Sequence, residues 1–301
     1  MTQATVLLGK GLDKDNNVVE VRGIPFYRER NTGVADSIQA LQEAQLLQVP
    51  TYLLGEGRVA AGRAAEASGD VNRALQESVW STWHDSFGET DTILDEQGIL
   101  GSAGQLYVAS FQNGGLFVHN PARIKNAVLG RNGQHLTDGY SLQLEQKEVN
   151  QVLDVVKRKD VAALVQMGVL RGNSAYAFQN FGEFAAASVR EDFTKEMPSY
   201  VVLRTAEAAR NNHSGYQSID AQRSNENLAL AFAGVERTGA VLEVAEKFGW
   251  TTFGSHHDGY QRPNSGRVVI LLNHGSGVSS GNNVGNGGRP VGVAPEALVA
   301  R

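Results

Sequence analysis

Two spacings of apolar residues alternate along this chain, and together they predict a mixture of helices and strands. Apolar residues recur every three or four positions within 32–48, 145–158 and 235–248, which is the spacing that buries one face of a helix. Asp160 is placed to cap a further helix through its side-chain oxygen. The alanine- and aromatic-rich segment 173–189 is also predicted to form a core helix.

Other segments alternate apolar and polar residues at every second position, which is the spacing of a strand. Residues 4–23 predict a β-hairpin around a polar turn. Asn113-Gly114 predicts a second hairpin, between strands over 106–111 and 115–119, because both residues tolerate the positive φ of a type I′ turn. Further strands are predicted at 199–204, at 251–254 and, as a continuous buried strand, at 268–272.

These elements predict an α+β fold with mixed or antiparallel sheets and packed helices, in two subdomains. The Asn-Gly hairpin adds an antiparallel component, which disfavours a purely parallel α/β fold. The segment 190–198 is charged, aperiodic and ends in proline, so we expect a domain boundary there. The first domain then covers 1–195, including a helical segment over about 145–189, and a smaller α+β domain covers 196–301.

Composition narrows the classes of function. The formal net charge of −5 disfavours a strongly basic nucleic-acid binder, so nucleic acid is an unlikely partner. The chain has no cysteine, which excludes disulfides, thiolate nucleophiles and Cys-ligated metal centres. The apolar run Ala4–Leu8 is too short for a signal peptide or a membrane span, and we therefore expect a soluble cytoplasmic protein without membrane contact.

The familiar catalytic motifs are absent from the sequence. It contains no H-E-x-x-H, G-x-S-x-G or Walker A sequence, and no EF-hand or kinase motif set. The segment Gly55–Arg58 lacks the full glycine spacing of a phosphate loop and is predicted to be a turn. No cofactor is indicated.

Three of the seven histidines lie in the region 253–293, which is the best place in the sequence to look for a site. His256 and His257 are neighbours in a predicted strand and point to opposite faces, so only one of them can share a site with Asp258 and His274. Such a set would suit zinc, manganese or iron if the chain after Asp258 folds back beside the first strand. His257, Asp258 and His274 are the corresponding acid–base candidates, and ordinary loop histidines are the alternative to either kind of site.

The segment Gly275–Gly288 holds six glycines and three asparagines. Backbone N–H groups in such a run can cradle an anion, with Arg267 or Arg289 supplying charge, and Arg204 is a further candidate contact for an anion or a partner. A surface loop that is ordered by its partner is the alternative, and solvated or locally paired arginines are the corresponding alternative for the charges.

Two hypotheses of function follow. The first is an assembly or regulatory protein that binds a macromolecular partner, either another protein or a second copy of itself, and its composition is compatible with a viral or mobile-element origin. The second is a small-molecule or phosphoester hydrolase that uses the C-terminal histidines and Asp258, with or without a divalent metal. The long Asn/Gly-rich segments and the lack of a catalytic motif favour the first hypothesis.

Overall fold

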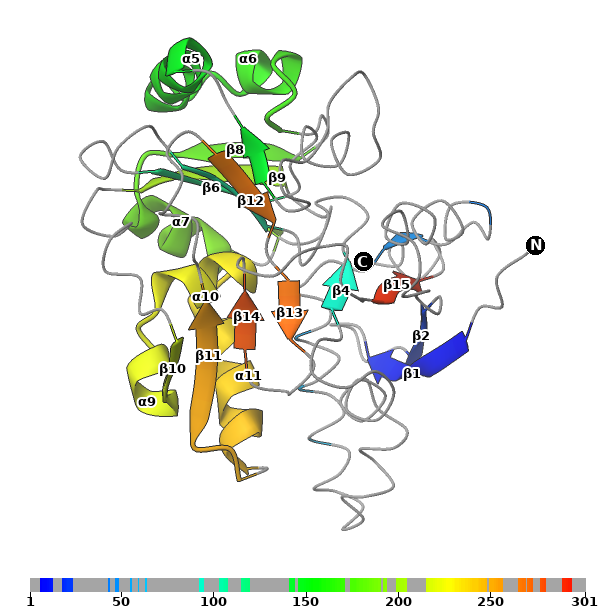
Figure 1. The fold of residues 1–301 in the computed structure, drawn as a ribbon. Helices are drawn as coiled ribbons and strands as arrows, with labels where there is room; N and C mark the ends of the chain where they lie inside the picture. The colour runs from blue at the N-terminus through cyan, green and yellow to red at the C-terminus, as the bar shows by residue number, and fades with distance from the viewer. Residues whose placement is uncertain are drawn as a thin grey trace.

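The fold is α+β and contains two β-sheets with helices packed against them, as seen in the computed structural model (Figure 1). The structure describes residues 6–12, 18–23, 43, 47–48, 55, 59, 63, 92–94, 103–107, 115–119, 141–143, 146–170, 174–190, 192–193, 199–204, 215–247, 249–256, 265–268, 270–272, 277–279 and 289–293. Among these residues, no helix is both long and apolar enough to cross a lipid bilayer.

The smaller sheet has six strands in the order β7-β12-β5-β6-β9-β8. Their bounds are β7 Ser141–Gln143, β12 Ser265–Val268, β5 Ala103–Tyr107, β6 Gly115–His119, β9 Ser199–Arg204 and β8 Ala175–Phe178. Neighbouring strands are antiparallel except for β8 and β9, which run parallel. The expected boundary near residue 195 falls between helix α7 (Phe181–Ser188) and β9, which pack together, and strands from both sides of it share this sheet.

The larger sheet has nine strands, eight of them in the order β1-β2-β15-β4-β13-β14-β11-β10. Their bounds are β1 Val6–Leu12, β2 Val18–Gly23, β15 Arg289–Val293, β4 Thr92–Leu94, β13 Ile270–Leu272, β14 Gly277–Ser279, β11 Thr252–His256 and β10 Gly215–Ser218. The ninth strand, β3 Leu47–Gln48, pairs with β15. Pairing is parallel between β11 and β14 and between β15 and β4, so both sheets are mixed.

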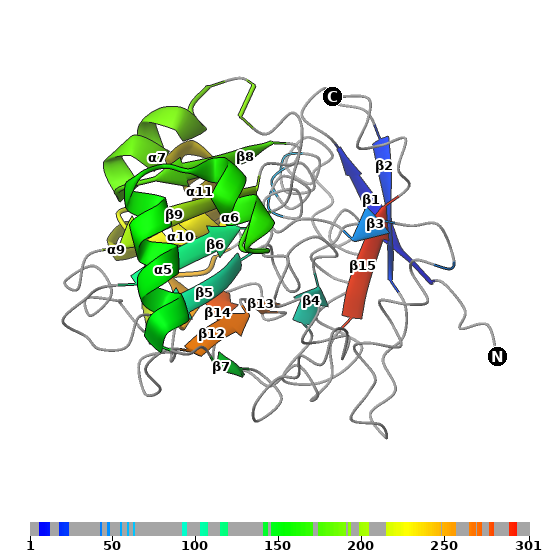
Figure 2. The same cartoon turned by 90° about the horizontal axis from the view of Figure 1, so that it is seen from above.

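Helices cover both faces of the six-stranded sheet (Figures 1 and 2). Helices α5 (Gln146–Lys157) and α6 (Val161–Gln166) lie on one face, and α7 and α10 (Glu226–Ala231) lie on the other. Helix α10 also contacts α11 (Val235–Lys247), and the short helix α9 (Ile219–Gln222) contacts β10 and β11. All residues of 227–231 in α10 are buried, so this helix belongs to the core between the sheets.

Aromatic side chains fill the space between α7 and the six-stranded sheet. The ring of Phe184 lies 5.1 Å from that of Tyr200 and 5.8 Å from that of Phe178. Phe193 packs 5.7 Å from Tyr200, so the charged segment 190–198 contributes a buried residue to the core. The hydroxyl of Tyr200 donates to the carbonyl oxygen of Leu230 at 2.5 Å, which ties β9 to α10.

Several sequence-based predictions are confirmed. The helix predicted at 145–158 is α5, Asp160 caps α6 by accepting from the Ala163 N–H at 3.0 Å, and the strand predicted at 199–204 is β9. The hairpin predicted at 4–23 is β1–β2.

Other predictions are wrong in part. The single helix predicted over 173–189 is a strand, β8, followed by α7, because Asn180 caps a helix that starts only at Phe181. Leu47 and Gln48 form a strand instead of the end of a helix, and Gly55 is helical instead of part of a turn. The second hairpin exists, but its first strand is β5, which ends at Tyr107 opposite Gly115.

The apolar run predicted as one strand over 268–272 is divided between the two sheets. Val268 ends β12 in the six-stranded sheet, whereas Ile270 begins β13 in the nine-stranded sheet. The chain therefore crosses from one sheet to the other within this run.

Candidate functional site

The β10–β11 edge of the nine-stranded sheet presents one buried face and one exposed face. The two strands are antiparallel, with Tyr216 opposite Gly254 and Gln217 opposite Phe253. Phe253 and Ser255 are fully buried, and because side chains alternate along a strand, the intervening positions belong to the opposite face. That opposite face carries Tyr216, which is 51% exposed.

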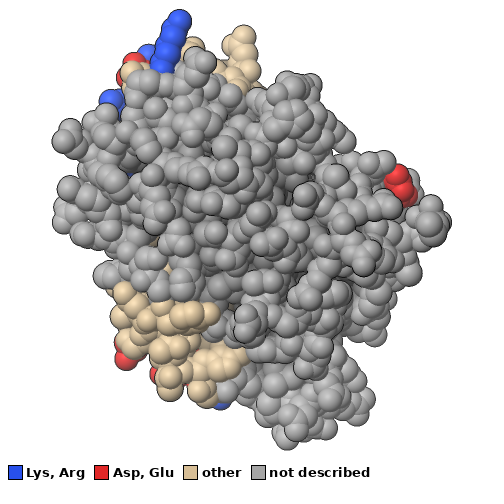
Figure 3. All heavy atoms as spheres, in the orientation of Figure 1, with Lys and Arg blue, Asp and Glu red and all other residues tan. Residues whose placement is uncertain are grey.

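We use the name β10–β11 face for the exposed side chains of Tyr216, Ser218 and Thr252. None of them is charged, and the space-filling view shows uncharged side chains gathered over this edge (Figure 3). Tyr216 offers a large amphipathic surface with few rotatable bonds, whereas the hydroxyl groups can donate or accept hydrogen bonds. The face is therefore suited to contact with a polar but uncharged surface.

Charged side chains beside this face are paired with one another. Arg223 comes directly after α9, and its Nη2 lies 3.0 Å from Glu246 Oε2 while its Nε lies 3.5 Å from Asp220 Oδ1. In α11, Lys247 Nζ lies 3.2 Å from Glu243 Oε1. Such exposed pairs contribute only about 0–1 kcal/mol each to stability. Arg223 and Lys247 are thus both compensated by acidic side chains, so neither adds an uncompensated positive charge beside the face.

His256 is the last residue of β11, and it pairs with Ser279 of β14. His257, Asp258 and His274 lie outside the described residues. The strand that follows Asp258, β12, pairs with β5 and β7 instead of lying beside β11, which corrects the arrangement expected from the sequence.

The two strands that lead toward the candidate histidines run in opposite directions and end at different levels. β13 runs antiparallel to β14, and β14 runs parallel to β11, with Ile270, Ser279 and His256 at one level. β11 therefore ends at this level, whereas β13 ends two residues further back at Leu272, about 7 Å along the strand direction. Within the described residues, no group of three or more His, Cys, Asp or Glu side chains could hold a metal ion. The metal and hydrolase hypotheses stay predictions.

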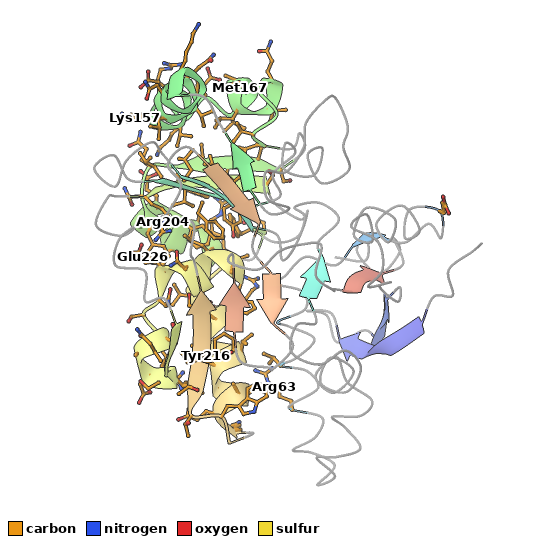
Figure 4. All side chains as sticks on the ribbon, in the orientation of Figure 1. Arg63, Lys157, Met167, Arg204, Tyr216 and Glu226 are labelled. Atoms are coloured by element: carbon orange, nitrogen blue, oxygen red, sulfur yellow. The ribbon has the colours of Figure 1, made fainter. Side chains whose placement is uncertain are left out.

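The three candidate arginines are distributed over both sheets. Arg204 ends β9 opposite Gly115 and is only 5% exposed (Figure 4), and Arg267 lies in β12 opposite Gln105. β9 and β12 are three strand spacings apart in the six-stranded sheet, or about 14 Å. Arg289 begins β15 in the nine-stranded sheet. Arg204 is therefore buried, and the anion- or partner-binding roles of all three arginines stay predictions.

Tyr216 is a functional candidate that the sequence reading did not identify (Figure 4). The sequence pattern predicts no strand at this position, whereas Gly215–Ser218 forms β10. The four-residue strand is too short for its alternation to stand out. Its exposure follows from pairing with β11, which is more than 30 residues away in the sequence.

Comparison with known proteins identifies no family. No family model matches this sequence, and no curated protein matches it. The fold is similar to that of a solved structure described as "Accommodation of massive sequence variation in Nanoarchaeota by the C-type lectin fold". That likeness has 13% sequence identity and a TM-score of 0.48, and it covers 86% of this chain and 92% of that chain.

Proposed function

We propose that this protein is a cytoplasmic binding protein that recognises another protein, or a second copy of itself, through the β10–β11 face. The observation that carries the proposal is the exposed ring of Tyr216 on the same strand face as the hydroxyl groups of Ser218 and Thr252. Aromatic residues are enriched in the centres of protein interfaces, and charged residues are depleted there. An assembly or regulatory role requires only such a contact surface.

The support beneath the face favours recognition by a preformed surface. Phe253 lies on the opposite side of β11 and is fully buried, and α9 contacts both strands. A binding surface held by packed secondary structure loses less conformational entropy on association than a surface on a loose segment. The β10–β11 face is therefore a better candidate for tight binding than isolated exposed side chains would be.

The charge of the face favours a protein over a nucleic acid as partner. Nucleic-acid binding relies on Lys and Arg contacts with phosphates, and its affinity falls steeply as salt increases. The β10–β11 face has no basic side chain, and the neighbouring Arg223 is paired with acidic residues. We expect binding at this face to change little with ionic strength.

A direct test is to select binders for the full-length protein from a displayed library of protein domains, including this chain itself. The dissociation constant of each binder is then measured for wild type, Tyr216→Ala and the control variant Lys157→Ala, whose exposed side chain lies on α5. We expect Tyr216→Ala to weaken binding by about tenfold or more, as for an aromatic hot spot, and Lys157→Ala to leave it unchanged. Failure to recover a binder, or equal affinity for all three proteins, would refute the proposal.

A further inference from the structure

Three buried amide groups form a chain of hydrogen bonds beneath the β10–β11 face. The Gln222 Nε2 group donates to the backbone carbonyl oxygen of Phe253 in β11 at 2.8 Å. The Asn225 Nδ2 group donates to Gln222 Oε1 at 2.6 Å, and the Asn227 backbone N–H donates to Asn225 Oδ1 at 2.9 Å. Gln222 is fully buried and Asn225 is 4% exposed, so water competes little for these bonds.

The chain of bonds has a fixed direction. A side-chain amide donates only through its nitrogen and accepts only through its oxygen. If Gln222 were turned over, its oxygen would face the Phe253 carbonyl and its nitrogen would face the Asn225 nitrogen, so both contacts would become repulsive. The orientation of Gln222 is therefore determined by Asn225, whose own orientation is determined by the first turn of α10.

The chain of bonds ends at Phe253 in β11, beside the position where pairing with β14 begins. Pairing between β11 and β14 begins with Gly254 opposite Gly277, so the register assigns Phe253 no partner residue in β14. On the other side, Phe253 lies opposite Gln217, which is between Tyr216 and Ser218 of the face. The bond from Gln222 thus fixes the backbone of β11 directly under those exposed side chains.

We infer that Gln222 and Asn225 are positioning residues, which hold β11 and thereby set the geometry of the β10–β11 face. Apolar side chains of similar size would fill the same space without the desolvation of several polar groups, but they would not specify the position of a backbone carbonyl. The consequence for partner binding rests on the proposed function, whereas the consequence for β11 itself does not.

The substitution Asn225→Asp separates positioning from helix capping. Aspartate is as good an N-cap as asparagine, so it keeps the acceptor for the Asn227 N–H. It cannot donate to Gln222, and its second oxygen instead attracts the Gln222 nitrogen. Gln222 would then present its oxygen to Phe253, and the link to β11 would be broken. A role limited to capping α10 predicts no local change in β11.

Hydrogen exchange, measured amide by amide on the full-length chain, gives the readout. For Asn225→Asp we expect protection at Gly254 and Ser255 in β11 to fall at least tenfold more than protection within α11. Gln222→Met, which removes both of its bonds, is expected to give the same pattern and serves as the second variant. The matched control is Tyr200→Phe, which removes a different buried hydrogen bond to a backbone carbonyl, that of Leu230. It is expected to spare β11.

The inference would be overturned if both Asn225→Asp and Gln222→Met lowered protection equally across β11 and α11. It would also be overturned if neither variant lowered protection in β11. A third refuting result is that Tyr200→Phe lowers protection in β11 as selectively as Asn225→Asp and Gln222→Met do. The affinities of wild type and Asn225→Asp are then measured for any partner whose binding depends on Tyr216. Absence of a partner would refute the proposed function alone, because the exchange measurement needs none. Equal affinity of Asn225→Asp and wild type for a confirmed partner would refute the link between this chain of hydrogen bonds and recognition.

Discussion

Replacing Gly55 by alanine is expected to destabilise the protein, whereas the same replacement at Gly239 is expected to stabilise it. Both glycines are helical, and Gly239 lies within α11. A Cβ atom at Gly55 would lie 2.9 Å from Cδ1 of Phe232 and 3.1 Å from Cγ2 of Val241, closer than carbon atoms normally approach. A Cβ atom at Gly239 would have nothing within 4 Å. The two sites therefore share the change in helix propensity and differ in packing.

The magnitudes follow from these two effects. Alanine is favoured over glycine in a helix by about 1 kcal/mol, which should appear almost unopposed at Gly239. At Gly55 the same gain is opposed by overpacking, which typically costs about 1–3 kcal/mol. Phe232 is fully buried and Val241 is 1% exposed, so neither side chain can move into solvent to relieve the contact. We expect Gly55→Ala to be less stable than Gly239→Ala by about 1–3 kcal/mol, and less stable than wild type.

Urea unfolding of wild type and the two variants measures this difference directly. The comparison requires equal m-values, because a changed slope would mean that the unfolded or native state had altered in compactness. If Gly55→Ala were as stabilising as Gly239→Ala, Gly55 would not lie as close to Phe232 and Val241 as the distances indicate.

Two further predictions concern the helices on the six-stranded sheet. The pKa of Glu183 is lowered because its carboxylate accepts from the Gln179 backbone N–H and pairs with Lys159. A lowered folded-state pKa means stabilisation that is present above the ordinary carboxyl pKa and lost as the pH falls through the folded-state value. Glu183→Gln should therefore be less stable than wild type at neutral pH, and the gap should close in acid. A gap that is constant with pH in urea unfolding would contradict this reasoning. Phe184→Ala, which empties the centre of the aromatic cluster, should lower the free energy of unfolding by about 3–5 kcal/mol. A loss near 1 kcal/mol would show that the cluster repacks.

Local patterns predicted the elements that are stabilised by local interactions. Helix α5 has a continuous apolar face and α6 has a capping aspartate, so both could be located from neighbouring residues alone. Strand β8 could not, because Tyr176 and Phe178 alternate over only two apolar positions before the apolar spacing becomes helical at Phe181. Its strand conformation is decided by parallel pairing with β9, which is a long-range interaction.

The sequence pattern does not show the crossing between the two sheets, for a related reason. The residues from Val268 to Leu272 are all apolar, so no polar position marks where β12 ends and β13 begins. A uniformly apolar run is compatible with one buried strand or with two short ones, and only the partners decide between them. The candidate site was missed in the same way, since β10 acquires its exposed and buried faces from β11.

The polar groups on the two sides of β11 differ in exposure to solvent, and this makes binding and stability separable. Beneath the strand, Gln222 and Asn225 have their amide groups bonded within the protein. On the outer face, Tyr216 and Thr252 are exposed and keep contact with solvent. Surface substitutions away from special features usually change stability by less than about 0.5 kcal/mol, whereas an unsatisfied buried polar group costs about 1–3 kcal/mol. Outer substitutions should therefore alter recognition at nearly constant stability, and inner ones should alter both.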